Sequence, residues 1–304
     1  MFLLFSVDNA AVAQDQKVFV TQFRNLDNSI EFRYTKEAIG SYFVEVELEY
    51  AENVDNNSFF DKNLNFNLNS NSGTLFKLTP LDKDKKIQCS YSFNYKVGVI
   101  GPKVDDLITY RLPFRKNKKV AIYELNRFGV SPNLWKTYIY YSKTKDTIYG
   151  MRKGVVVDIK KIAATSLKIA DEPATVYRTE VIVEHADGTN ASYTGLNEKM
   201  LLVKLGQTIY PQTTMGVMDD FTDSNLDHNF RFNIYYFSNE QIDNLSGKKS
   251  KVMEKSVMPN FLTENGSQRL DGEKSYIVKS DDSVLFQEMT PDEKAKYFMN
   301  SQAF

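Results

Sequence analysis

The sequence predicts a mainly β protein, and three observations support this fold class. Apolar and polar residues alternate in several stretches, most clearly over residues 44–50, where a glutamate separates each apolar residue from the next. A period of two is typical of a strand with one buried face. Phe (21) and Tyr (18) are abundant, whereas Gly (14) and Pro (8) are few, which favours strands over disorder. A clear helix signal appears only near the C-terminal end.

The first half of the chain has the pattern of an antiparallel sandwich. Residues 91–97 repeat the alternation seen over residues 44–50, and half-buried strands of this kind belong to antiparallel sheets. Between them, residues 53–73 are rich in Asn and Ser and indicate a loop or edge, with one short strand over residues 64–68. We therefore predict a β-sandwich domain over residues 17–109.

A second β region follows a connector that contains Gly101 and Pro102. Apolar, β-branched runs predict strands in the domain that we place over residues 110–237, and the remaining residues, 238–304, form a polar C-terminal extension. The extension ends in a predicted helix: Thr290 is a good N-cap, Pro291 suits the first helical position, and Glu293 completes a capping box. These strand runs cover residues 154–159, 179–184 and 230–235.

The N-terminal residues resemble an export signal. Residues 1–7 are apolar, and Ala11 and Ala13 flank Val12 in the small-x-small pattern of a signal-peptidase site. We predict a signal or leader segment over residues 1–16 and a protein that is secreted, periplasmic or associated with the cell envelope. No other stretch approaches the roughly 18 apolar residues of a membrane span, so we expect no transmembrane span in the mature protein.

Charge and cysteine content exclude two classes of function. Thirty-eight Lys and Arg residues balance 39 Asp and Glu residues, for a formal net charge of −1, so the broad basic surface of a nucleic-acid-binding protein is not expected. Cys89 is the single cysteine and forms no internal disulfide. A catalytic thiol needs a histidine partner, and the chain contains only two histidines.

Five ordered segments within residues 110–235 resemble the M23 family of peptidoglycan peptidases, also called the LytM or lysostaphin-type family. The resemblance implies an antiparallel β domain of the barrel-sandwich type, and the preceding sandwich is similar to a domain that accompanies some secreted members. The segments are residues 110–114 (YRLPF), 147–157 (TIYGMRKGVVV), 183–189 with 193–196 (VEHADGT, YTGL), 203–209 with 215–217 (VKLGQTI, MGV), and 229–234 (NFRFNI).

The resemblance also indicates that the catalytic residues are lost. The family holds a tetrahedral zinc with two histidines and an aspartate, and further histidines position the attacking water. In this chain the aspartate position falls at or near Ile139, and residues 129–136 lack the upstream histidine. The remaining histidine positions hold Gly195, Asn229 and Arg231. Isoleucine and glycine have no side-chain lone pair, and a guanidinium repels a dication, so we expect no metal or other cofactor.

Three further residues are candidates for binding, each with a structural alternative. His185 lies in a turn where the family often has a histidine that is not a ligand. His228 precedes the degenerate pair by one residue, and a one-residue slip would move the apolar face of its strand. Trp135 and the nearby tyrosines could stack on sugars or pack in the core. Acidic residues between 219 and 227 suggest a solvated loop rather than a calcium site, because the EF-hand spacing is absent.

The resemblance therefore implies a non-catalytic cell-envelope protein that binds peptidoglycan or regulates a cell-wall hydrolase. Ile139, Gly195, Asn229 and Arg231 would mark the former catalytic groove. We expect Arg231 to offer a fixed cation to a carboxylate of a stem peptide or of a partner. Two alternatives remain open: an active M23-type metalloendopeptidase with unusual ligands, and a structural or adhesion module in which the sandwich binds and the second domain is a scaffold.

Overall fold

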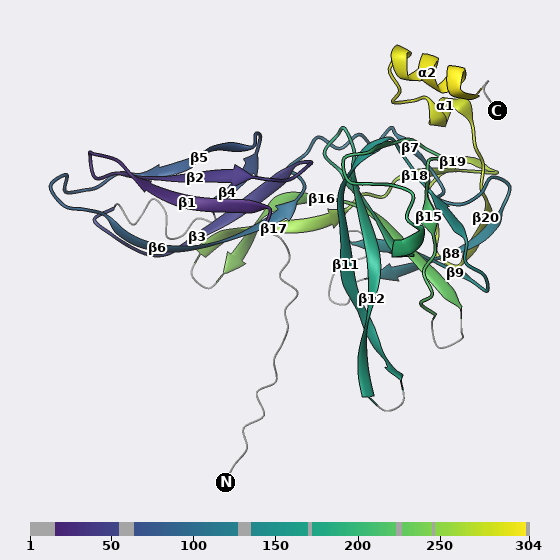
Figure 1. Ribbon diagram of the computed structural model, residues 1–304, viewed down its shortest axis with the longest axis horizontal. Coiled ribbons are helices and arrows are strands. Elements are labelled where there is room, and N and C mark those ends of the chain that lie inside the picture. The colour runs from purple at the N-terminus through teal and green to yellow at the C-terminus, as the bar shows by residue number, and fades with distance from the viewer. Residues whose placement is uncertain are drawn as a thin grey trace, which may run out of the picture.

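The computed structural model describes residues 16–54, 64–126, 135–169, 172–222, 227–244 and 247–301. Within these residues strands predominate, most pairs are antiparallel, and the α-helices lie at the C-terminal end (Figure 1). The predicted mainly β fold is confirmed. The predicted leader falls, except for its last residue, outside the described residues. No helix in the described ranges is long and apolar enough to cross a membrane.

The first lobe is a sandwich of two three-stranded antiparallel sheets with a shared apolar core. The alternation over residues 44–50 places Val44, Val46 and Leu48 in this core, while the intervening glutamates face outward. The short strand predicted over residues 64–68 is present. One sheet contains β1 (Val18–Arg24), β2 (Ile30–Lys36) and β5 (Ser72–Leu78), and the other contains β4 (Leu64–Leu68), β3 (Tyr42–Glu52) and β6 (Gln88–Val97).

The second lobe is organised around a nine-stranded sheet. Eight of its strands lie in one row, and β17 pairs with β16 beside that row. Its long hairpin β11–β12 projects from the lobe (Figure 1). In spatial order the strands are β14 (Thr208–Ile209), β11 (Gly154–Ile169), β12 (Glu172–Glu184), β13 (Asn190–Leu196), β16 (His228–Asn244), β9 (Lys136–Ser142), β8 (Lys119–Asn126) and β20 (Lys274–Ile277), with β17 at Gly247–Ser256.

Two smaller sheets and two short helices complete the described part of this lobe. Strand β7 pairs with β18 in parallel, unlike the other strand pairs described here. The capping box predicted at Thr290 forms, since Glu293 Oε2 accepts from the Thr290 amide at 2.7 Å. The elements are β7 (Thr109–Arg111), β18 (Asn260–Thr263) and β19 (Gly266–Gln268); β10 (Thr147–Tyr149) and β15 (Thr214–Val217); a 3-10 turn at Glu198–Met200; and α1 (Asp282–Leu285) and α2 (Pro291–Ser301).

The residues predicted as a C-terminal extension are part of this lobe. Strand β17 pairs with β16, β18 lies beside β7, and β20 pairs with β8. The core on one face of the large sheet therefore takes side chains from both ends of the lobe, including Tyr110 and Phe261.

The two faces of the large sheet differ in character. Side chains such as Tyr193, Phe230 and Phe232 fill the apolar core. Their neighbours along the same strands point to the opposite face, because side chains alternate along a strand. We call this opposite face the polar face; it carries Glu180, Ser192, Thr194, Asn229 and Arg231.

The two lobes are closely packed where β16 and β17 reach the first lobe (Figure 1). Phe43 of the first lobe contacts Phe237 at 4.8 Å between ring centroids. Lys17 forms an ion pair of 2.6 Å with Asp158, and a Cβ at Gly40 would overlap with the side chain of Val157. Glycine at residue 40 thus permits direct contact between the lobes.

Candidate functional site

Strand pairing brings the four predicted groove positions together on the polar face. Arg231 pairs with Ile139 of β9 on one side and with Thr194 of β13 on the other. Gly195 follows Thr194, and a Cβ at Gly195 would lie 3.0 Å from the carbonyl oxygen of Asn229. The groove inferred from the resemblance is therefore one contiguous region of the sheet.

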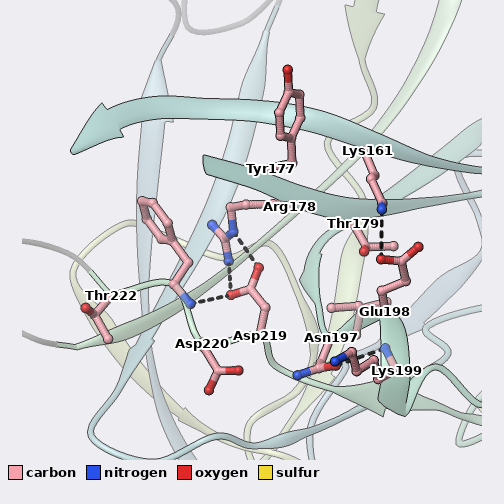
Figure 2. Close-up of a pocket in the computed structure, with 12 residues that line it drawn as sticks. Lys161, Tyr177, Arg178, Thr179, Asn197, Glu198, Lys199, Asp219, Asp220 and Thr222 are labelled. Atoms are coloured by element: carbon pink, nitrogen blue, oxygen red, sulfur yellow. Dashed lines mark hydrogen bonds and ion pairs between the residues drawn. The ribbon is translucent and has the colours of Figure 1, made fainter. Parts of the chain in front are cut away.

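An arginine that the sequence did not reveal occupies the centre of this region. The guanidinium of Arg178, on β12, is only 3% exposed. Its Nη1 donates to Asn229 Oδ1 at 2.7 Å, and its Nη2 donates to the Asn229 carbonyl at 2.5 Å. Its Nε and Nη2 also donate to the two carboxylate oxygens of Asp219, at 2.8 and 3.1 Å (Figure 2). We call Arg178, Asp219 and Asn229 the arginine network.

The arginine network depends on the glycine beside it. Gly195 has φ +103, in the region that disfavours side chains, and a Cβ there would overlap with Nη2 of Arg178. A histidine at residue 195 is therefore incompatible with the observed position of Arg178. The position of Arg178 therefore requires a glycine at residue 195.

Substituting alanine for Gly195 tests this dependence. We expect Gly195→Ala to lower the free energy of unfolding by about 2–3 kcal/mol, since strained backbone and overpacking add together. Urea denaturation of the variant would measure the loss. Gly266→Ala is the matched control, because Gly266 also has positive φ (+91) but has no atom within 4 Å of the added Cβ. Equal losses in the free energy of unfolding for the two variants would show that overlap with Arg178 contributes nothing to the effect of Gly195→Ala.

Arg231 is a half-buried cation beside the arginine network. Its Nε is buried without a hydrogen-bond partner, and none of the carboxylates in the described ranges forms an ion pair with it. Burial, and next the positive charge of Arg178, lower the pKa of the Arg231 guanidinium. Asp219 neutralises Arg178, whereas no carboxylate within the described ranges pairs with Arg231. An anion bound at Arg231 would be stabilised by this local field.

The donor set at this site does not fit a zinc ion. Asn229 already uses its side-chain oxygen to accept from Arg178, and Ile139, Gly195 and Arg231 offer no lone pair. Among the residues that the structure describes, no group of three or more His, Cys, Asp or Glu side chains could hold a metal. Of the acidic residues between 219 and 227, the three that the structure describes are paired with cations: Asp219 with Arg178, Asp220 with Lys145, and Asp227 with Lys143.

The other three candidate residues are not members of the arginine network, although His228 directly precedes Asn229. His185 follows the end of β12, is 3% exposed, and has Nδ1 2.9 Å from Thr189 Oγ1. Burial, and next the charge of Arg152, lower its pKa to about 3, so it is neutral at ordinary pH. His228 pairs with Ser142 at the start of β16. Trp135 precedes β9, and its Nε1 donates to Glu254 at 3.2 Å.

An open hollow of about 560 Å³ lies beside the arginine network. Figure 2 shows Arg178 and Asp219 on one side of it and an ion pair between Lys161 and Glu198 on the other. Tyr177 is 59% exposed at its rim. The hollow extends the polar face toward solvent, so a ligand at this face has room beyond the buried arginine.

Comparison of the chain with known protein families, with curated proteins and with solved structures found no match in any of the three.

Proposed function

We propose that this chain is a non-catalytic, M23-like cell-envelope protein that uses its polar face to bind peptidoglycan or to regulate a cell-wall hydrolase. The observation that carries the proposal is the arginine network. Where the resemblance would place zinc-binding histidines, Arg178 is held by Asp219 and Asn229. A buried guanidinium that donates four hydrogen bonds to Asp219 and Asn229 supports a binding role, because it offers no group for activating water.

The charge of Arg231, which pairs with no carboxylate in the part of the chain that the structure describes, supports an anionic ligand. Its guanidinium is half-buried, so part of the cost of removing the charge from water is already present in the free protein. A carboxylate that approached it would form charge-assisted, bidentate hydrogen bonds. The stem peptides of peptidoglycan carry carboxylates, as do acidic side chains of a protein partner.

Truncation of Arg231 tests the proposal directly. We expect Arg231→Ala to weaken binding to purified peptidoglycan by roughly ten- to a hundredfold, as lost charge-assisted hydrogen bonds would. Arg231→Lys should restore only part of the affinity, because a lysine lacks the planar fork. Co-sedimentation with purified peptidoglycan measures both. Arg33→Ala, at an exposed arginine of the first lobe, is the control and should bind normally.

The alternatives give different results. A metalloendopeptidase with unusual ligands would retain near one equivalent of zinc after dialysis, measured by mass spectrometry, and would cleave peptidoglycan. A structural or adhesion module would bind equally well with Arg231→Ala. Point variants are preferable to deletion of residues 110–237 for this test, because β17, β18 and β20 pair with strands inside that range.

A further inference from the structure

The polar face becomes apolar on one side of Arg231. Strand pairing places Ile139 of β9 between Arg231 of β16 and Tyr123 of β8, and opposite residues of neighbouring strands project to the same face. Tyr141 lies two residues beyond Ile139 along β9. Leu125 lies two residues beyond Tyr123 along β8, so both share this face. We call Tyr123, Leu125 and Tyr141 the apolar shelf. Their side chains are 39%, 41% and 36% exposed, so a ligand can reach them.

The two tyrosine rings of the apolar shelf form a corner. Tyr123 and Tyr141 lie 5.5 Å apart between ring centroids, and their ring planes are 70° apart. A flat sugar ring could stack on one of these rings but not on both. An aliphatic side chain can contact both rings, and Leu125 next to them is itself aliphatic. The shape of the shelf therefore favours an apolar side chain.

The guanidinium of Arg231 lies at the edge of the apolar shelf. Arg231 and Tyr141 are diagonal neighbours on adjacent strands, a separation of about 7–8 Å that long side chains can bridge. Nε of Arg231 is enclosed, and Nη1 and Nη2, which are not enclosed, form no hydrogen bond with a described residue. The planar fork can thus bind both oxygens of one carboxylate.

A carboxylate bound at Arg231 would meet no competitor among the described residues. Acidic side chains on the strands and the loop around Arg231 are paired with other cations. Glu273 is exposed and directly precedes β20, so that β8 and β9 separate it from Arg231. The pairs are Glu124 with Lys136, Glu180 with Lys160, Asp219 with Arg178, Asp220 with Lys145, and Asp227 with Lys143.

The C-terminal residue of a peptide presents a carboxylate and a side chain on the same carbon atom. One group can therefore contact Arg231 while the other enters the corner between the two tyrosine rings. The carboxylate of an aspartate or glutamate side chain has only short methylene links beside its charge. A stem peptide that is not cross-linked ends in a free carboxylate of the first kind.

We propose that Arg231 and the apolar shelf bind the free C-terminal residue of a peptidoglycan stem peptide. The carboxylate lies on Arg231, and an apolar side chain lies between Tyr123 and Tyr141. This inference rests on the proposed function and names the part of the ligand that the site recognises. The protein would then prefer stem peptides that are not cross-linked.

Blocked tripeptides test this recognition with the purified full chain. N-acetylated trialanine with a free C-terminal carboxylate would be compared by calorimetry with its C-terminal amide. A third peptide is the amide in which glutamate replaces the last alanine, and each peptide would be made with an L- and with a D-residue at its end. We expect the acid to bind roughly tenfold more tightly than its amide and roughly threefold or more tightly than the glutamate peptide.

Variants of the apolar shelf test the second contact. Tyr141→Ala should weaken binding of the acid roughly three- to tenfold through lost apolar contact, and Tyr123→Ala is a second variant of the same kind. Tyr50→Ala is the matched control and should bind normally, because Tyr50 is 44% exposed on a strand of the first lobe. Circular dichroism would show that each variant is folded.

Competition with purified peptidoglycan tests the source of the ligand. The trialanine acid should displace the protein in co-sedimentation, and the amide should not. Equal affinity for the acid and either other peptide would overturn this inference, while loss of peptidoglycan binding by Arg231→Ala would still support the proposed function. Failure of the acid to displace the protein, unchanged affinity of both tyrosine variants, or no binding of the acid at millimolar concentration would also overturn it.

Discussion

Replacing Arg178 with alanine should lower the free energy of unfolding by about 3–5 kcal/mol, as the loss of one partner from a buried ion pair does. The variant would leave the largely buried carboxylate of Asp219 without its cation. It would also leave the side-chain and backbone oxygens of Asn229, which is 2% exposed, without donors. Urea denaturation followed by circular dichroism would measure the loss.

A double variant distinguishes loss of an interaction from loss of volume. Arg178→Met combined with Asp219→Leu removes both charges and keeps most of the apolar bulk, and such replacements are often neutral or stabilising. We therefore expect the double variant to be more stable than Arg178→Ala. If the single variant lost less than about 1 kcal/mol, the value of an exposed ion pair, the arginine network would have no role in stability.

Replacing Arg152 with alanine should have an effect of similar size, about 3–5 kcal/mol. Arg152 is 1% exposed, and its Nε and Nη2 donate to the two carboxylate oxygens of Glu288 at 2.9 and 2.8 Å. Its Nη1 donates to Asp187 and to the hydroxyl of Tyr110, both at 2.9 Å. The substitution would leave two carboxylates without a cation in a largely buried place, and urea denaturation would measure the loss.

The Arg152 variant should also loosen the C-terminal segment that carries Glu288. Hydrogen exchange measured by mass spectrometry would show faster exchange in α1 and α2 than in the wild type. Lys153→Ala is the matched control, since the neighbouring ion pair between Lys153 and Glu293 is about a quarter exposed and should contribute at most about 1 kcal/mol. Similar losses in the free energy of unfolding for the two variants would show that the buried ion pairs of Arg152 contribute no more than the more exposed ion pair of Lys153.

Local patterns in the sequence predicted much of the fold. Alternation over residues 44–50 and 91–97 corresponds to β3 and β6, and the capping box at Thr290 begins α2. These local patterns did not predict which strands distant in sequence pair with one another. Residues 238–304 looked like an extension because nothing local indicates that β20 pairs with β8, or that β18 lies beside β7.

The sequence predicted some residues of the candidate site. Gly195, Asn229 and Arg231 could be placed because they lie in segments with a recognisable pattern, and Ile139 by its distance from the segment that begins at residue 147. Arg178 could not, because its partners Asp219 and Asn229 are 41 and 51 residues away in sequence, and no spacing rule connects them. The resemblance thus pointed to this region of the sheet but not to the buried cation at its centre.

Strand β16 runs from Arg231 on the polar face to the contact of Phe237 with Phe43 of the first lobe. Arg231 lies four residues from Tyr235 and six from Phe237 on this strand, which corresponds to about 13–20 Å at 3.3 Å per residue. At Gly40 the first lobe approaches Val157 of β11 closely enough to leave no room for a Cβ. A ligand held at Arg231 that also contacts the first lobe would have to span this distance. A polymer can do so through two linked contacts, which raise its affinity through effective concentration, whereas an isolated building block reaches only one of the two places and binds more weakly.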